Sequence, residues 1–84
     1  MNIEGRTVLV TGANRGIGAA LTVGAINQGA ARIFALVRNR DNMSWCADKR
    51  VTALQADVRN FDEVLAASKE VPRLDVIINN AGIL

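Results

Sequence analysis

The sequence predicts an α/β fold in which strands of a parallel sheet alternate with helices. Short apolar runs recur along the chain, and segments with helical spacing or polar composition separate them. The first apolar run, residues 8–10, leads into the glycine-rich stretch 11–18, and a helical pattern follows that stretch. Apolar strands that are joined through helices indicate parallel pairing by right-handed crossovers, with both faces of the sheet buried.

Four strands are predicted from apolar and β-branched runs. They span residues 6–11, 32–37, 51–56 and 74–79. In the doubly wound arrangement, a partial Rossmann fold, these strands take the order 3-2-1-4 in the middle layer of a three-layer sandwich. The crevice between the first and fourth strands is then the topological switch point, where such sheets bind ligands.

The first of about three helices is expected over residues 15–28, because apolar and small residues recur there at helical spacing. Gly29 then provides a stop signal. Small side chains on the inner face would allow this helix to approach the sheet closely. The residues predicted to face the sheet are Ile17, Ala20, Leu21, Gly24, Ala25 and Gln28.

Two further helical segments are expected. Residues 39–49 are polar with a weak helical pattern, which predicts a short helix or helical turn. A third helix should begin after a cap at Asn60 or Asp62 and end before Pro72, since the residue before a proline avoids the helical region. We interpret the acidic residues Asp62 and Glu63 as a solvated helix face. The first two crossovers should lie on one face of the sheet and the third on the opposite face.

Composition narrows the classes of function. The chain has 84 residues, which favours a single domain, and half of them are apolar. The net charge is +2 without a basic run, so nucleic-acid binding is not expected. Uncharged runs, such as residues 76–84, are shorter than the ~20 residues of a membrane span, so no span is expected either. With no histidine and one cysteine, neither a metal site nor a disulfide framework is predicted. The start of the chain lacks the features of a signal peptide, which favours a cytoplasmic protein.

The glycine-rich stretch is a candidate phosphate-binding loop. Glycines at 12, 16 and 18 would allow a tight turn, a close approach of backbone N–H groups to a pyrophosphate, and packing of the helix on the strand. The start of the helix adds unpaired N–H groups and the positive end of its dipole. The alternative is a plain tight turn. Thr11 either orients the loop through its hydroxyl or is an ordinary strand end.

Three motifs together resemble the short-chain dehydrogenases/reductases. Thr11-Gly12-x-x-x-Gly16-x-Gly18 resembles the cofactor loop of that family, and Asp57-Val58 falls where the family carries an adenine-contacting Asp. Asn79-Asn80-Ala81-Gly82 resembles the family's turn after the fourth strand. The resemblance covers essentially the whole chain. It implies an oxidoreductase that moves hydride between a nicotinamide cofactor and a carbonyl or alcohol.

NADP (NADPH) is the predicted cofactor, with NAD less favoured. Arg38 directly follows the second strand, where an NAD-preferring site usually carries an acid. Arg15 could place a second cation on the same 2′-phosphate, because guanidinium groups bind phosphate in a bidentate manner. The alternative is two solvated surface arginines. For Asp57, the alternative to adenine binding is a cap on the third helix.

The predicted site is confined to cofactor binding. The cofactor-binding residues are Gly12, Asn14, Arg15, Gly16, Ile17, Gly18, Arg38, Asp57, Val58, Asn79, Ala81 and Gly82. No catalytic residue is assigned, because the chain has no tyrosine and the family's Tyr-x-x-x-Lys pair would follow Leu84. Residues 1–84 are therefore expected to be one truncated dinucleotide-binding domain that is inactive alone.

The alternative function is a non-catalytic half-Rossmann fragment that self-assembles and binds nucleotide weakly or not at all. In either case, residues 76–78 would lie on an exposed sheet edge, which favours association with another strand. We therefore expect a homodimer through the fourth-strand edges or the open sheet face.

Overall fold

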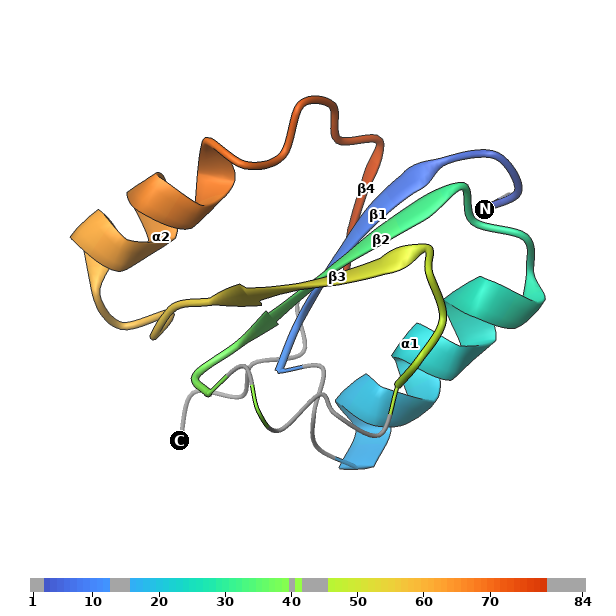
Figure 1. Ribbon diagram of the computed structural model, residues 1–84, viewed down its shortest axis with the longest axis horizontal. Helices are drawn as coiled ribbons and strands as arrows, with labels where there is room; N and C mark the ends of the chain where they lie inside the picture. Colours follow the sequence, from blue (N-terminus) through green and yellow to red (C-terminus); the bar gives the residue numbers. More distant parts are fainter. Residues whose placement is uncertain (1–2, 13–15, 40, 42–45, 79–84) are drawn as a thin grey trace.

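The computed structural model describes residues 3–12, 16–39, 41 and 46–78. Their elements, in chain order, are β1 (Thr7–Thr11), α1 (Gly16–Asn27), β2 (Arg32–Val37), β3 (Val51–Gln55), α2 (Phe61–Ser68) and β4 (Val76–Ile78). The strands form one sheet in the order β3-β2-β1-β4, and every neighbouring pair is parallel (Figure 1). The predicted α/β fold, its four parallel strands and their order are confirmed.

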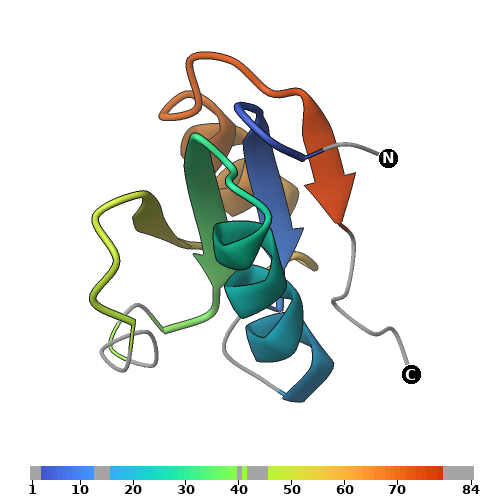
Figure 2. The same ribbon diagram turned by 90° about the vertical axis from the view of Figure 1, so that its right-hand side faces the viewer.

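The two helices cover opposite faces of the sheet. Figure 2 shows α1 in front of the strands and α2 behind them. Side chains alternate along β2: Ile33 and Ala35 belong to the core on the α1 side, whereas Phe34 and Leu36 belong to the core on the α2 side. Because both faces of β2 are covered, residues 33–37 are all buried. The predicted three-layer arrangement and the opposite side of the last crossover are confirmed.

The segment between β2 and β3, predicted as a short helix or helical turn, is described only in part, with Asp41 in a 3₁₀ turn. Its described residues, 39, 41 and 46–49, form no α-helix, and the remainder of the expected helix 39–49 lies outside the described residues. Asp48 instead opens a tight turn, in which its Oδ1 accepts the Arg50 N–H at 2.8 Å. The Arg50 guanidinium returns to Asp48 and also donates to the Ile26 carbonyl oxygen at 3.3 Å. This turn joins the start of β3 to the last turns of α1.

The predicted inner face of α1 is wrong for half of its six residues. Ala25 is buried, Leu21 and Gly24 are half-buried, and Ile17, Ala20 and Gln28 are exposed. The buried residues are Gly18, Thr22 and Ala25. Because the helix is almost uniformly apolar, its sequence pattern does not single out one face. Thr22 tolerates complete burial because its hydroxyl donates to the Gly18 carbonyl oxygen at 2.9 Å.

The cap of α2 is one of the two residues, Asn60 and Asp62, that the sequence predicts for this helix. Asn60 is the cap of α2, and its Oδ1 accepts the Glu63 N–H at 3.2 Å. The helix ends at Ser68, four residues before Pro72. β4 is shorter than predicted, and Asn79 lies outside the described residues. Within the described ranges, neither helix has the length and apolar character needed to cross a membrane.

Candidate functional site

The carboxyl ends of β1, β2 and β3 meet at one edge of the sheet. The Gly12 N–H donates to the Leu36 carbonyl oxygen at 3.1 Å, and the Ala56 N–H donates to the Val37 carbonyl oxygen at 2.9 Å. These bonds extend the pairing by one residue beyond β1 and β3, so the loops that follow the strands start side by side. α1 also begins at this edge (Figure 1). The predicted cofactor residues in the described ranges therefore gather where a doubly wound sheet binds ligands.

The glycine loop has the backbone that its residue types predict. Gly12 and Gly16 have φ angles of +63° and +28°, in the left-handed region that favours glycine. A Cβ placed on Gly16 would meet no atom of the described residues within 4 Å, so there is open space beside Gly16 in that part of the structure. The first turn of α1 holds no acidic residue that would repel an anion. The Gly12 N–H is already bonded within the sheet, so any phosphate contact must come from other N–H groups of the loop.

The other predicted residues of the glycine-rich stretch differ in their burial. Gly18 is buried against the sheet, as expected of a glycine that lets the helix pack closely. Ile17 is 71% exposed. Thr11 is buried at the end of β1, so a loop-orienting role for its hydroxyl stays a prediction. The predicted site residues Asn14, Arg15, Asn79, Ala81 and Gly82 lie outside the described residues, as does Asn80.

Arg38 and Asp57 lie close together at the ends of β2 and β3. The Asp57 carboxylate pairs mainly with Arg59. The Arg59 Nε donates to Oδ1 at 3.0 Å, and its Nη2 donates to Oδ2 at 2.8 Å. These side-chain bonds, a bond from the Arg59 N–H and a smaller electrostatic contribution from Arg38 hold the pKa of Asp57 well below its usual range. Asp57 is therefore an ionised acceptor that is paired with Arg59 and lies within the electrostatic influence of the exposed Arg38.

Arg59 and Glu63 are contacts of this loop that the sequence interpretation missed, and Glu63 makes its contacts from α2. Its Oε1 accepts the Asp57 N–H at 3.0 Å, and its Oε2 accepts the Asn60 Nδ2 at 3.0 Å. Glu63 is exposed, as predicted for a solvated helix face, and these two bonds are a further role that the interpretation did not include. The Asn-x-x-Glu spacing of a capping box is the signal that could have found it. Asn60 is also the cap, so the alternative that Asp57 caps the helix is wrong.

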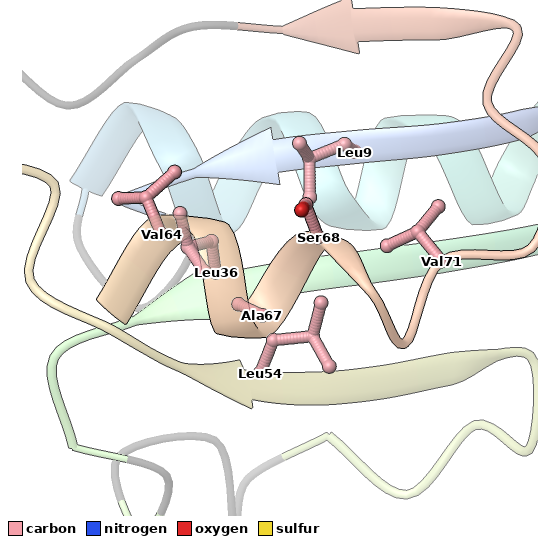
Figure 3. Close-up of a pocket in the computed structure, with 7 residues that line it drawn as sticks. All are labelled: Leu9, Leu36, Leu54, Val64, Ala67, Ser68 and Val71. Carbon is pink, nitrogen blue, oxygen red and sulfur yellow. The ribbon is translucent and has the colours of Figure 1, made fainter. Parts of the chain in front are cut away.

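An apolar recess lies under α2. Figure 3 shows its lining side chains between that helix and the sheet. They are Leu9, Leu36, Leu54, Val64, Ala67, Ser68 and Val71. Among the residues that the structure describes, the lining of this recess includes no charged side chain and no predicted cofactor residue. Its apolar lining does not suit a dinucleotide, which needs groups that recognise phosphate.

Comparison with known proteins decides the family. The model of the short chain dehydrogenase family matches residues 6–84, which is nearly the whole chain. This chain belongs to the short-chain dehydrogenase family. Its glycine loop, Arg38 and Asp57 therefore lie in the oxidoreductase fold that the sequence motifs resemble.

Three similar proteins illustrate the relationship. D-xylose 1-dehydrogenase of Caulobacter vibrioides is 33% identical over 86 residues, covering 96% of this chain and 35% of that protein. Oxidoreductase UcpA of Salmonella typhimurium is 38% identical over 98 residues, covering 96% of this chain and 34% of that protein. A Burkholderia cenocepacia short chain dehydrogenase, solved in complex with NADP, superposes with a TM-score of 0.92 at 36% identity, covering 99% of this chain and 35% of that chain. The present chain thus spans about a third of the length of these relatives.

Proposed function

We propose that this chain is the NADP(H)-binding half of a short-chain dehydrogenase, and that the complete protein transfers hydride between NADP and a carbonyl or alcohol substrate. The observation that carries the proposal is the exposed Arg38 at the end of β2. An acid at this place binds the ribose 2′-OH of NAD, whereas an arginine accommodates the 2′-phosphate of NADP. A family member with a TM-score of 0.92 was solved with NADP, which supports the same cofactor here.

The residues at the carboxyl edge fit the parts of this cofactor. The open space at Gly16 and the acid-free start of α1 suit the pyrophosphate. Arg38 would bind the 2′-phosphate through its guanidinium. The ionised Asp57 would accept a hydrogen bond from the adenine amino group, and Val58 would donate its backbone N–H. The nicotinamide ring supplies the hydride chemistry when bound.

The remaining predicted residues complete the proposed site. Asn14, Arg15, Ile17 and Gly18 would belong to the phosphate loop with Gly12. Asn79, Ala81 and Gly82 would line the ribose at the switch point. No residue of this chain is assigned to proton transfer, and residues 1–84 are proposed to act as one cofactor-binding domain without catalysis of its own.

Isothermal titration calorimetry of this chain with NADPH and with NADH tests the proposal. We expect saturable binding of one NADPH per chain, tighter than the binding of NADH. Absence of binding for both nucleotides, or equal affinity, would contradict it. Incubation with NADPH and a panel of aldehydes and ketones tests the catalytic silence of the chain, and sustained turnover in proportion to protein concentration would refute it.

We also propose that the chain forms a homodimer. The Ile77 side chain on β4 is 60% exposed, and β4 has β1 as its single sheet neighbour among the described strands. An unpaired strand edge with an apolar side chain favours association with a second copy. A cytoplasmic location stays a proposal as well, and fractionation of cells that produce the full-length protein tests it.

A further inference from the structure

We propose that Glu63 is a positioning residue, which holds the turn of residues 57–60 in the shape that recognises adenine. The inference rests on the proposed nucleotide-binding function. Glu63 lies in the first turn of α2, on an element separate from the strand end that it contacts. Its two carboxylate oxygens accept hydrogen bonds from two different points of the turn, the Asp57 N–H and the Asn60 Nδ2, each at 3.0 Å.

The other backbone N–H groups of the turn, those of Asp57, Arg59 and Asn60, already donate hydrogen bonds within the chain. The Asn60 N–H donates to the Asp57 carbonyl oxygen at 2.8 Å, and the Arg59 N–H donates to the Asp57 Oδ1 at 2.9 Å. Within the described part of the chain, no acceptor receives the N–H of Val58. The turn therefore presents one backbone donor, Val58 N–H, next to one ionised acceptor, Asp57.

An adenine edge offers the complementary pair, an amino donor and a ring-nitrogen acceptor. Both contacts form only if the Asp57 carboxylate and the Val58 N–H keep a fixed separation. Glu63 fixes this separation without touching the nucleotide, because it anchors the Asp57 N–H to α2. Without this anchor, ordering of the turn would have to occur on binding, and the apparent affinity would fall.

Three variants separate positioning from charge. Glu63→Asp keeps the negative charge at the start of α2 but shortens the side chain, so it cannot reach both donors. Glu63→Gln removes the charge and the bond from the Asn60 Nδ2, but its length and its one acceptor oxygen keep the bond from the Asp57 N–H that anchors the turn. Asp62→Asn is the matched control, because Asp62 is an exposed acid of the same helical turn. Circular dichroism verifies that each variant is folded.

The probes are 2′,5′-ADP, which carries the adenine ring and the 2′-phosphate, and pyrophosphate, which lacks the ring. We expect Glu63→Asp to weaken 2′,5′-ADP binding about three- to tenfold, a change typical of one lost hydrogen bond. Glu63→Gln and Asp62→Asn should stay within about twofold of the original chain, the scatter of surface substitutions. Pyrophosphate binding should not change in any variant, and hydrogen exchange of the Asp57 amide should accelerate in Glu63→Asp.

Failure of this inference and failure of the proposed function look different. If the original chain binds 2′,5′-ADP and Glu63→Asp binds it equally well, the positioning role is overturned while the nucleotide-binding function stands. An equal loss in Glu63→Gln and Asp62→Asn would overturn it too, because the effect would then be one of charge. If the original chain does not bind 2′,5′-ADP, the proposed function fails and the positioning role fails with it.

Discussion

Thr7 and Asp75 exchange two hydrogen bonds that start the pairing of β4 with β1. The Thr7 N–H donates to the Asp75 Oδ2 at 2.9 Å, and the Asp75 N–H donates to the Thr7 carbonyl oxygen at 3.0 Å. The next residue, Val76, then pairs with Val8. Because both strands are parallel, this junction at their amino ends also sets which residues of β4 reach the carboxyl edge beside the glycine loop.

Removal of the Asp75 carboxylate should loosen this junction. Asp75→Ala deletes the acceptor of the Thr7 N–H, and we expect the Tm of the chain to fall by about 4–8 °C. Asp75→Asn keeps an oxygen acceptor at the same position and should recover most of that loss. Thermal unfolding followed by circular dichroism measures both variants. A Tm for Asp75→Ala equal to that of the original chain would contradict the junction's role.

Acid should destabilise the chain through three carboxylates whose pKa values the fold lowers. Arg50, chiefly through its side-chain hydrogen bonds, lowers the pKa of Asp48 to about 2 from the usual 3.8. Arg59 lowers the pKa of Asp57, and the Thr7 N–H lowers that of Asp75. A depressed pKa in the folded state stabilises the fold above the unfolded-state pKa and loses that contribution as the pH falls through the folded-state pKa.

The stability should therefore be constant from neutral pH to about pH 5 and fall progressively between about pH 4 and pH 2. Urea unfolding at a series of pH values measures the free energy of unfolding across this range. The combined variant Asp48→Asn and Asp75→Asn should show a shallower fall. A free energy of unfolding that stays level or rises between pH 4 and pH 2 would contradict the prediction.

Arg38 should decide the preference for NADP. Arg38→Asp replaces the proposed 2′-phosphate ligand by a repelling charge, and we expect NADPH binding to weaken about 10- to 100-fold more than NADH binding. Lys49→Asp is the matched control, because it makes the same charge change at an exposed residue. Lys49 lies just before β3, near the amino end of that strand and away from the carboxyl edge. Calorimetric titration of both variants gives the comparison. Equal losses for the two nucleotides in Arg38→Asp would mean that Arg38 does not face the 2′-phosphate.

The exposed edge of β4 should carry the self-association. Ile77→Lys places a charge on that edge, and we expect it to convert a dimer into a monomer. Val23→Lys is the matched control, because Val23 is 42% exposed on α1, away from the edge. Size-exclusion chromatography with light scattering measures the mass. A stable monomer of the original chain at micromolar concentration would refute the homodimer.

The strands and their order could be predicted from the sequence because their signals are local and strong. β2 spans residues 32–37 as predicted, since an unbroken apolar run is typical of a strand that is buried on both faces. The glycine loop was equally readable, because Gly12 and Gly16 adopt left-handed backbone angles that other residues avoid. The crossing of the last helix to the other face followed from the doubly wound order.

Other features depend on contacts that no local pattern encodes. Half of the predicted inner face of α1 was wrong, because residues on all sides of that helix are apolar. Only packing against the sheet determines that Gly18 and Thr22 are buried. The Asn60–Glu63 cap could have been read from its spacing. The bond from the Asp57 N–H to Glu63 could not, because it depends on the path of the chain between β3 and α2. The predicted roles of Asn14, Arg15 and the 79–82 turn stay predictions.

Nuclear magnetic resonance mapping of NADPH binding tests the central claim most directly. The chain is labelled with ¹⁵N, and its amide spectrum is followed during titration with NADPH. We expect the largest shifts at the carboxyl edge of the sheet, including the amides of Gly16, Arg38 and Val58. An unchanged spectrum, or shifts confined to the residues around the recess under α2, such as Leu54 and Ala67, would contradict it.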